Sequence, residues 1–91
     1  MKINAIDQYG RISEYDAILT YHSDEYNKHY VVYTDNTYDE NNELIIYISS
    51  YNLVNPETVV KPIDNQKEYN KIKTEINKIL LTIKNESDKI N

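Results

Sequence analysis

The spacing of the apolar residues changes once along this chain, at about residue 64. Before that point apolar and polar residues alternate, which is typical of β-strands with one buried face. After it, apolar residues recur every three or four positions, which is typical of an amphipathic helix. The helical stripe consists of Tyr69, Ile72, Ile76, Ile79, Leu80 and Ile83. The sequence therefore predicts strands first and one C-terminal helix after them.

The alternating part contains five strand candidates separated by polar or turn-forming stretches, at residues 2–7, 13–21, 29–34, 44–51 and 58–63. Gly10, the only glycine, suits a tight turn after the first of them. Residues 29–34 are apolar on both faces, which predicts a central position in the sheet. Residues 52–57 are expected to form a turn, and Pro62 marks the last candidate as an edge strand or a strand end.

The second strand candidate has the clearest alternation. It places Tyr15, Ala17, Leu19 and Tyr21 on one face, and Ile18 interrupts the otherwise polar opposite face. These four side chains are therefore expected to point into the same side of the sheet.

The predicted helix covers residues 65–84. Asn65 is suited to cap its first turn, and Glu68 stands at the third helical position, as in a capping box. Glu68 near the start and Lys84 near the end also suit the helix dipole. Residues 85–91 are polar and are expected to form a disordered tail beyond a single domain of residues 1–84.

These elements predict an α+β fold, an antiparallel β-meander of four to five strands covered on one face by the C-terminal helix. With 91 residues the chain has room for one domain and excludes the larger enzyme folds. The helix is expected to contribute Tyr69, Ile72, Ile76, Ile79 and Ile83 to the core. The sheet is expected to contribute Leu19, Val32, Ile46 and Ile48.

Charge and composition exclude several function classes. Residues 1–63 carry ten acidic side chains against four basic ones, and the whole chain has a formal net charge of −5. This balance disfavours nucleic-acid binding and anionic membranes. The chain has no cysteine, which excludes disulfides and thiol chemistry, and it shows no secretory signal or membrane-spanning run. A cytoplasmic location is expected.

No catalytic residue, cofactor or metal site is predicted, and the chain is not expected to be an enzyme. Residues 35–43 resemble a calcium loop, but Glu40 stands where the turn needs glycine and Ile46 where a bidentate glutamate is needed. His22 and His29 flank a polar connection and could approach each other across a hairpin. Whether either feature binds an ion stays open at this point.

The sheet face away from the helix is the predicted binding surface. Tyr33, Ile45 and Tyr47 are expected to lie on it, with Glu14 and Asp16 at its rim. An apolar patch with an acidic rim suits an unidentified protein partner or a second copy of the chain. The alternative is that tyrosines on the open sheet stack on single-stranded nucleic acid, as in an accessory factor to nucleic-acid-processing enzymes.

Several stretches, in the right order, resemble the YrzB-like family of small acidic proteins of low-GC Gram-positive bacteria. They are residues 13–21 (SEYDAILTY), 28–35 (KHYVVYTD), 43–51 (ELIIYISSY) and 60–64 (VKPID), followed by Glu68-Tyr69. The chain departs from the family where Tyr69 replaces a tryptophan and where Ile45 and Lys67 replace acidic residues. The resemblance implies no activity or site residue. Genes of this family often lie beside one for a Holliday-junction-resolvase-like protein, which supports the nucleic-acid alternative by association.

Overall fold

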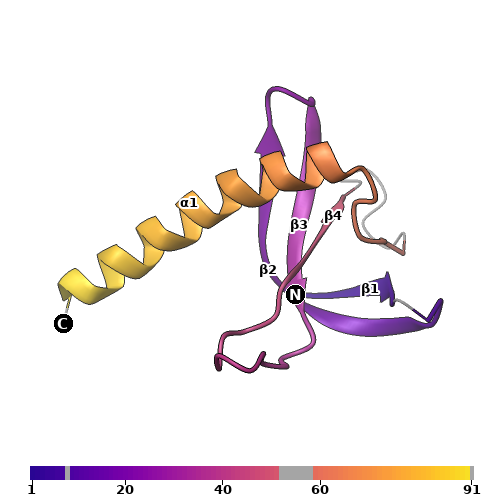
Figure 1. Cartoon of the computed structure of the whole chain (residues 1–91), viewed down its shortest axis with the longest axis horizontal. Coiled ribbons are helices and arrows are strands. Elements are labelled where there is room, and N and C mark those ends of the chain that lie inside the picture. Colours follow the sequence, from indigo (N-terminus) through magenta and orange to yellow (C-terminus); the bar gives the residue numbers. More distant parts are fainter. Residues whose placement is uncertain (8, 52–58, 91) are drawn as a thin grey trace.

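The computed structural model describes residues 1–7, 9–51 and 59–90, and it shows an antiparallel four-stranded sheet followed by one helix (Figure 1). The strands are neighbours in the sheet in the same order as in the chain. This confirms the predicted α+β meander with a C-terminal helix. The elements are β1 (Lys2–Ile6), β2 (Ile12–Ser23), β3 (Lys28–Thr34), β4 (Tyr47–Ser50) and α1 (Gln66–Ile90).

Strand β3 is the centre of the sheet, as its two apolar faces predicted. It lies between β2 and β4, and its residues 30–33 are buried on both faces. Tyr30 and Val32 belong to a hydrophobic cluster under α1, whereas Val31 and Tyr33 belong to a second cluster on the opposite face. The fold therefore has two cores, one on each side of this strand.

Part-way along β2, a β-bulge reverses the side of the sheet to which alternate side chains point. Ala17 pairs with Tyr33 and Leu19 pairs with Val32, so Ile18 is an extra residue that forms a β-bulge. One extra residue shifts the alternation and turns every later side chain to the other face. The prediction that Tyr15, Ala17, Leu19 and Tyr21 share one face is therefore wrong. Tyr15 and Ala17 contact the cluster away from the helix, while Leu19 and Tyr21 contact the cluster under it.

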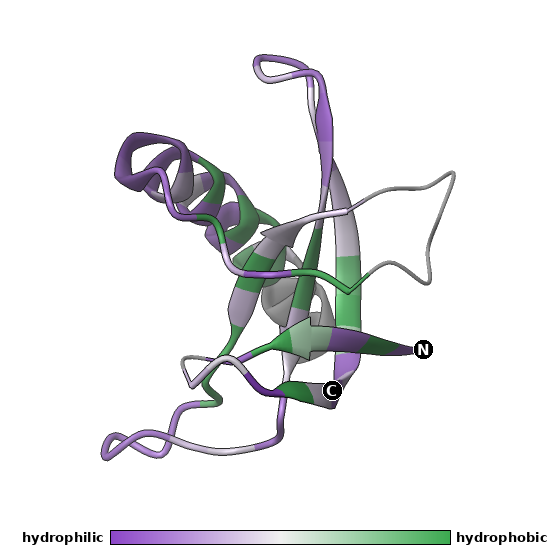
Figure 2. Cartoon of the chain, turned by 90° about the vertical axis from the view of Figure 1, so that its right-hand side faces the viewer, coloured by the Kyte–Doolittle hydropathy of each residue, from purple (hydrophilic) through white to green (hydrophobic). Residues whose placement is uncertain are grey.

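The core under α1 largely matches the prediction. Leu19, Val32, Ile46 and Ile48 contribute to it from the sheet side. The helix contributes Tyr69, Ile72, Ile76 and Leu80, and its polar side faces away from the sheet (Figure 2). Ile79 is half-buried outside this cluster, because Leu80 is the residue that continues the row one turn after Ile76. The predicted contribution of Ile83 lies outside the described side chains.

The face away from the helix is filled rather than open. Strand β1 and the first part of β2 run across the direction of β3, so the sheet folds over this face (Figure 1). Ile3 and Ala5 of β1 are buried there. Among the described residues, the buried members of this cluster are Ile3, Ala5, Tyr15, Val31, Tyr33 and Val60. The expectation of an exposed reverse face is corrected by this second core.

A short segment, residues 59–63, covers both outer edges of the sheet. Val60 exchanges two backbone hydrogen bonds with β1, of 2.9 and 3.0 Å. Three residues later, the N–H of Ile63 donates to the carbonyl of Ile48 in β4, at 3.2 Å. Unpaired strand edges recruit other chains, and these three hydrogen bonds occupy edge groups of β1 and β4 that could otherwise do so.

The fourth and fifth strand candidates differ from the observed elements. The fifth strand candidate is reduced to isolated bridges at Val60 and Pro62, because proline has no N–H to extend a ladder. The expected turn over residues 52–57 lies outside the described residues. The fourth strand begins at Tyr47 rather than at residue 44. Before it, the carbonyl of Ile45 accepts the Thr34 hydroxyl instead of joining the ladder, at 2.7 Å.

Helix α1 continues to Ile90, beyond the predicted end at Lys84. Residues 85–90 are therefore helical rather than an irregular tail. The sequence after Pro62 contains no glycine or proline, which are the residues that usually end a helix. The C-terminal part of α1 projects beyond the sheet (Figure 1).

Candidate functional site

A pocket of about 630 Å³ lies where the bent sheet meets residues 59–63, which we call the closing segment. Its wall contains three tyrosines from three adjacent strands, namely Tyr15 of β2, Tyr33 of β3 and Tyr47 of β4. Its charged lining consists of Asp7, Arg11, Glu14, Asp35, Lys61 and Asp64. All of these charged residues except the half-buried Asp7 are exposed. The pocket therefore combines an aromatic wall with a charged rim, and we call it the tyrosine pocket.

The three tyrosine rings support one another. Tyr15 meets Tyr33 and Tyr47 edge to face, with ring centroids 5.2 and 5.8 Å apart. Tyr33 and Tyr47 are opposite each other on β3 and β4, and their rings stack at 5.6 Å. The Tyr33 hydroxyl also shares a hydrogen bond of 2.7 Å with the Ser49 hydroxyl. These contacts fix the orientation of the wall, since edge-to-face and offset-stacked pairs are the favourable aromatic geometries.

Carboxylates act on the tyrosine hydroxyls electrostatically. Burial raises the pKa of Tyr47, and the negative charge of Asp35 raises it further. Burial likewise raises the pKa of Tyr15, with smaller contributions from Tyr47, Asp7 and Asp35. An anion that disfavours tyrosinate also favours a cation in the same space. The pocket is therefore a negatively biased environment.

Of the two cations on the pocket lining, Arg11 lies beside a ring and a carboxylate. The Arg11 guanidinium sits 5.2 Å from the centroid of the Tyr9 ring, and its Nε lies 3.5 Å from Asp7 Oδ2. Asp7 also organises the hairpin, because its Oδ1 accepts the backbone N–H groups of Tyr9 (2.8 Å) and Arg11 (2.9 Å). The hydrogen bond from the Arg11 backbone N–H is the largest of the contributions that lower the pKa of the Asp7 carboxyl. Asp7 is therefore a stable anion at neutral pH.

The structure brings together three of the five predicted binding residues. Glu14, Tyr33 and Tyr47 line the tyrosine pocket. Tyr33 is only 1% exposed, so it supports the wall from within and does not offer an open surface. Ile45 is half-buried and does not line the pocket. Asp16 forms an ion pair with Lys2 and accepts a hydrogen bond of 2.6 Å from Asn36, so its carboxylate has a local structural role.

The sequence did not identify the other ten lining residues, which are Ile6, Asp7, Tyr9, Arg11, Ser13, Tyr15, Asp35, Lys61, Pro62 and Asp64. Regular alternation puts Tyr15 on the same face as Leu19, under the helix, whereas the bulge at Ile18 turns it to the opposite face. Ile18 was the available signal, since it interrupts the polar face of an otherwise regular strand. The other residues reach the pocket through turns and long-range backbone pairing, which leave no local pattern in the sequence.

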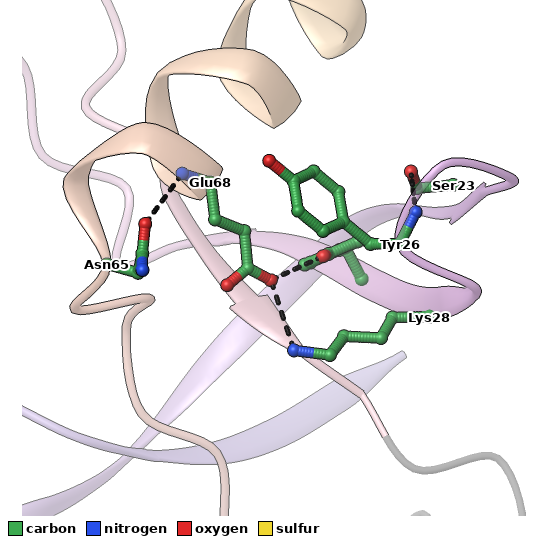
Figure 3. Close-up of polar contacts among 6 residues, drawn as sticks. Ser23, Tyr26, Lys28, Asn65 and Glu68 are labelled. Carbon is green, nitrogen blue, oxygen red and sulfur yellow. Dashed lines mark hydrogen bonds and ion pairs between the residues drawn. The ribbon is translucent and has the colours of Figure 1, made fainter.

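A second polar cluster fastens the helix to the sheet (Figure 3). Glu68 Oε2 accepts hydrogen bonds from the Tyr30 hydroxyl (2.5 Å) and from Lys28 Nζ (3.3 Å). The Glu68 N–H donates to Asn65 Oδ1 at 2.9 Å, which confirms the predicted cap. Further along α1, Glu75 accepts a hydrogen bond from the Tyr21 hydroxyl. Both glutamates are engaged by β-strand tyrosines, so this cluster serves attachment.

The buried tyrosines predict a loss of stability at alkaline pH. Burial and then the Glu68 carboxylate raise the pKa of Tyr30, and burial raises that of Tyr33. An unfolded tyrosine releases its proton at about pH 10, whereas these folded tyrosines still hold theirs. The free energy of unfolding is therefore expected to be constant just below about pH 10 and to fall as the pH rises above it.

Urea denaturation at a series of pH values measures this decline. Tyr30→Phe removes one of the responsible hydroxyls and is expected to make the decline shallower. Tyr38→Phe, at an exposed position, is the matched control and is expected to leave the slope unchanged. A urea midpoint that stays constant from about pH 9 to about pH 12 would contradict the assignment.

The histidines do meet across the hairpin. His22 and His29 are opposite each other on β2 and β3, with ring centroids 4.5 Å apart, and His22 Nδ1 lies 3.4 Å from Asp24 Oδ1. Within residues 1–7, 9–51 and 59–90, no group of three or more His, Cys, Asp or Glu side chains is arranged to hold a metal ion. In residues 35–43, which we call the acidic loop, Asp35 and Asp39 accept hydrogen bonds from nearby backbone N–H groups and so stabilise turns.

In comparisons with known proteins, no family model, no curated protein and no solved structure matches the chain. In the part of the chain that the structure describes, no helix has the length and apolar character needed to cross a bilayer.

Proposed function

We propose that this protein is a non-catalytic protein-binding module and that the tyrosine pocket accommodates a short segment of its partner. The observation that carries the proposal is a pocket of about 630 Å³ whose wall is three mutually packed tyrosines. This volume is within the range of roughly 300–1,000 Å³ that is typical of ligand sites. Tyrosine contributes a rigid contact area and a polar tip, and it is enriched in protein interfaces.

The protonation equilibria of the pocket support binding rather than catalysis. A general acid or base works best when its pKa lies near the working pH. The pKa of Asp7 is lowered, and the pKa values of Tyr15, Tyr33 and Tyr47 are raised. Each of these shifts moves the group away from neutral pH, so none of the four is suited to proton transfer.

The rim of the pocket favours a protein ligand over nucleic acid. Four carboxylates, those of Asp7, Glu14, Asp35 and Asp64, would repel a phosphate backbone.

We extend the proposal to membership of the YrzB-like family and to a cytoplasmic location, on the basis of the sequence resemblance and the absence of cysteine. The family implies no activity that could be transferred to this chain.

Site-specific photo-crosslinking in cells tests the proposed function. A photoreactive phenylalanine derivative at position 9, on the pocket lining, is compared with the same residue at position 38, away from the pocket. Both tyrosines are highly exposed, at 71% and 61%. We expect position 9 to give a discrete protein adduct, with the partner or a second copy of the chain, and position 38 to give none.

A charge substitution in the crosslinking protein locates the contact. Glu14→Lys, on the pocket lining, is expected to abolish the adduct from position 9. Glu40→Lys makes the same charge change at an exposed loop residue and is expected to leave the adduct intact. Equal adducts from positions 9 and 38, or an adduct that survives Glu14→Lys, would count against the pocket as the binding site.

A further inference from the structure

The charges that line the tyrosine pocket are unequal in sign. Four carboxylates face two cations, Arg11 and Lys61. Arg11 is already engaged by Asp7, so Glu14, Asp35 and Asp64 exceed the remaining cationic charge. These three carboxylates are exposed, and together they attract an incoming cation, more strongly where the apolar wall excludes water from the contact. The net charge of −5 also steers a basic ligand toward the protein over a longer range.

The pocket lining shows how this chain holds a cation. Arg11 lies over the Tyr9 ring and beside the Asp7 carboxylate, so its guanidinium has an aromatic face and an anion as neighbours. Asp35 lines the same pocket as Tyr47 and Tyr15, and its negative charge contributes to the raised pKa of both tyrosines. A guanidinium is planar and more weakly hydrated than an ammonium group, so it suits such a place better than lysine does.

We infer that the tyrosine pocket binds an arginine side chain presented by a basic segment of a partner protein. The inference rests on the proposed function and names the chemistry of the ligand. The pocket spans the β1–β2 hairpin, the ends of β2, β3 and β4, and the closing segment, so it can also contact the residues that flank the arginine. The guanidinium lies against the tyrosine wall, and the carboxylates of Glu14, Asp35 and Asp64 accept its hydrogen bonds.

Short peptides that differ in one side chain separate the contribution of its charge to binding from that of its shape. The probe is acetyl-Gly-Ala-Arg-Ala-Gly-amide, titrated into isotopically labelled protein and followed by the backbone amide resonances. The matched peptides carry citrulline, lysine or norleucine in place of arginine, and free arginine is titrated separately. We expect saturable shifts centred on Tyr15, Asp35 and Tyr47 with the arginine peptide. The citrulline peptide, which has the same shape without the charge, is expected to bind at least tenfold more weakly. Free arginine tests whether the ligand is a small molecule rather than a segment, and it is expected to bind more weakly than the peptide.

Paired substitutions test the carboxylates. Glu14→Gln with Asp64→Asn removes two charges at exposed pocket residues and is expected to weaken binding of the arginine peptide at least threefold. Glu40→Gln with Glu43→Gln makes the same change in net charge on the acidic loop and is expected to have little effect. Higher salt is expected to weaken binding to the wild-type protein.

The outcomes distinguish this inference from the proposed function. If the citrulline or norleucine peptide shifts the same resonances with equal affinity, the arginine inference fails while the pocket remains a binding site. The inference also fails if the arginine peptide shifts resonances only outside the pocket, or if both paired variants weaken binding equally. If no peptide perturbs the pocket and position 9 gives no adduct, the inference and the proposed function fail together.

Discussion

Replacing Ile76 by alanine is expected to lower the free energy of unfolding by about 2–5 kcal/mol. The side chain is fully buried in the cluster between α1 and the sheet, beside Ile72 of the helix and Ile48 of β4. Its truncation leaves a cavity in a small core with little room to collapse. Alanine forms helices better than isoleucine does, so helix propensity does not cause the loss. A decrease of this size is a large fraction of the stability of a domain of this length.

Urea denaturation followed by circular dichroism measures this effect. Leu81→Ala is the matched control, because Leu81 lies on the same helix and is 60% exposed. We expect the control to change the free energy of unfolding by less than about 0.5 kcal/mol. A similarly small change for Ile76→Ala would mean that α1 does not cover the sheet in solution.

Replacing Tyr33 by alanine is expected to cost about 3–5 kcal/mol, the range for large aromatic side chains in a core. Tyr33 packs against Tyr15 and Tyr47, and its hydroxyl shares a hydrogen bond with Ser49. This substitution tests the second core, on the face of the sheet that α1 does not cover. A surface tyrosine on an open sheet would give a far smaller loss.

Two further variants show how much the Tyr33 hydroxyl and the burial of its ring each contribute to the free energy of unfolding. Tyr33→Phe keeps the ring and removes the hydroxyl, so it is expected to cost only about 1 kcal/mol. Tyr38→Ala truncates an exposed tyrosine and is expected to lie within about 0.5 kcal/mol of the wild type. If Tyr33→Ala were as mild as Tyr38→Ala, the reverse face would be open, as the sequence alone suggested.

Local periodicity was enough to predict the helix and the central strand. Ile72 and Ile76 recur at helical spacing, and residues 30–33 are apolar on both faces, so each pattern identifies its element. The cap at Asn65 was predictable for the same reason, since its partner is three residues away. These features depend on interactions between residues that are close in the sequence.

The second core and the pocket depend on interactions that local patterns do not record. The bulge at Ile18 reverses the faces of β2, and regular alternation therefore placed Tyr15 on the wrong side. Tyr33, Tyr47 and Glu14 were identified as binding residues, but as parts of an open surface rather than of a pocket. Lys61 and Asp64 reach the pocket only because Val60 pairs with β1, more than fifty residues earlier in the chain.

The pairing of Val60 with β1 has a consequence for the order in which the molecule assembles during synthesis. β1 can pair with β2 as soon as the first hairpin has left the ribosome, but its other flank gains the Val60 hydrogen bonds only when residue 60 emerges. Contacts that close a long loop form late, because the entropy of the loop must be lost first. The nascent chain therefore passes through a stage in which the flank of β1 that Val60 will cover is open to pairing with other chains.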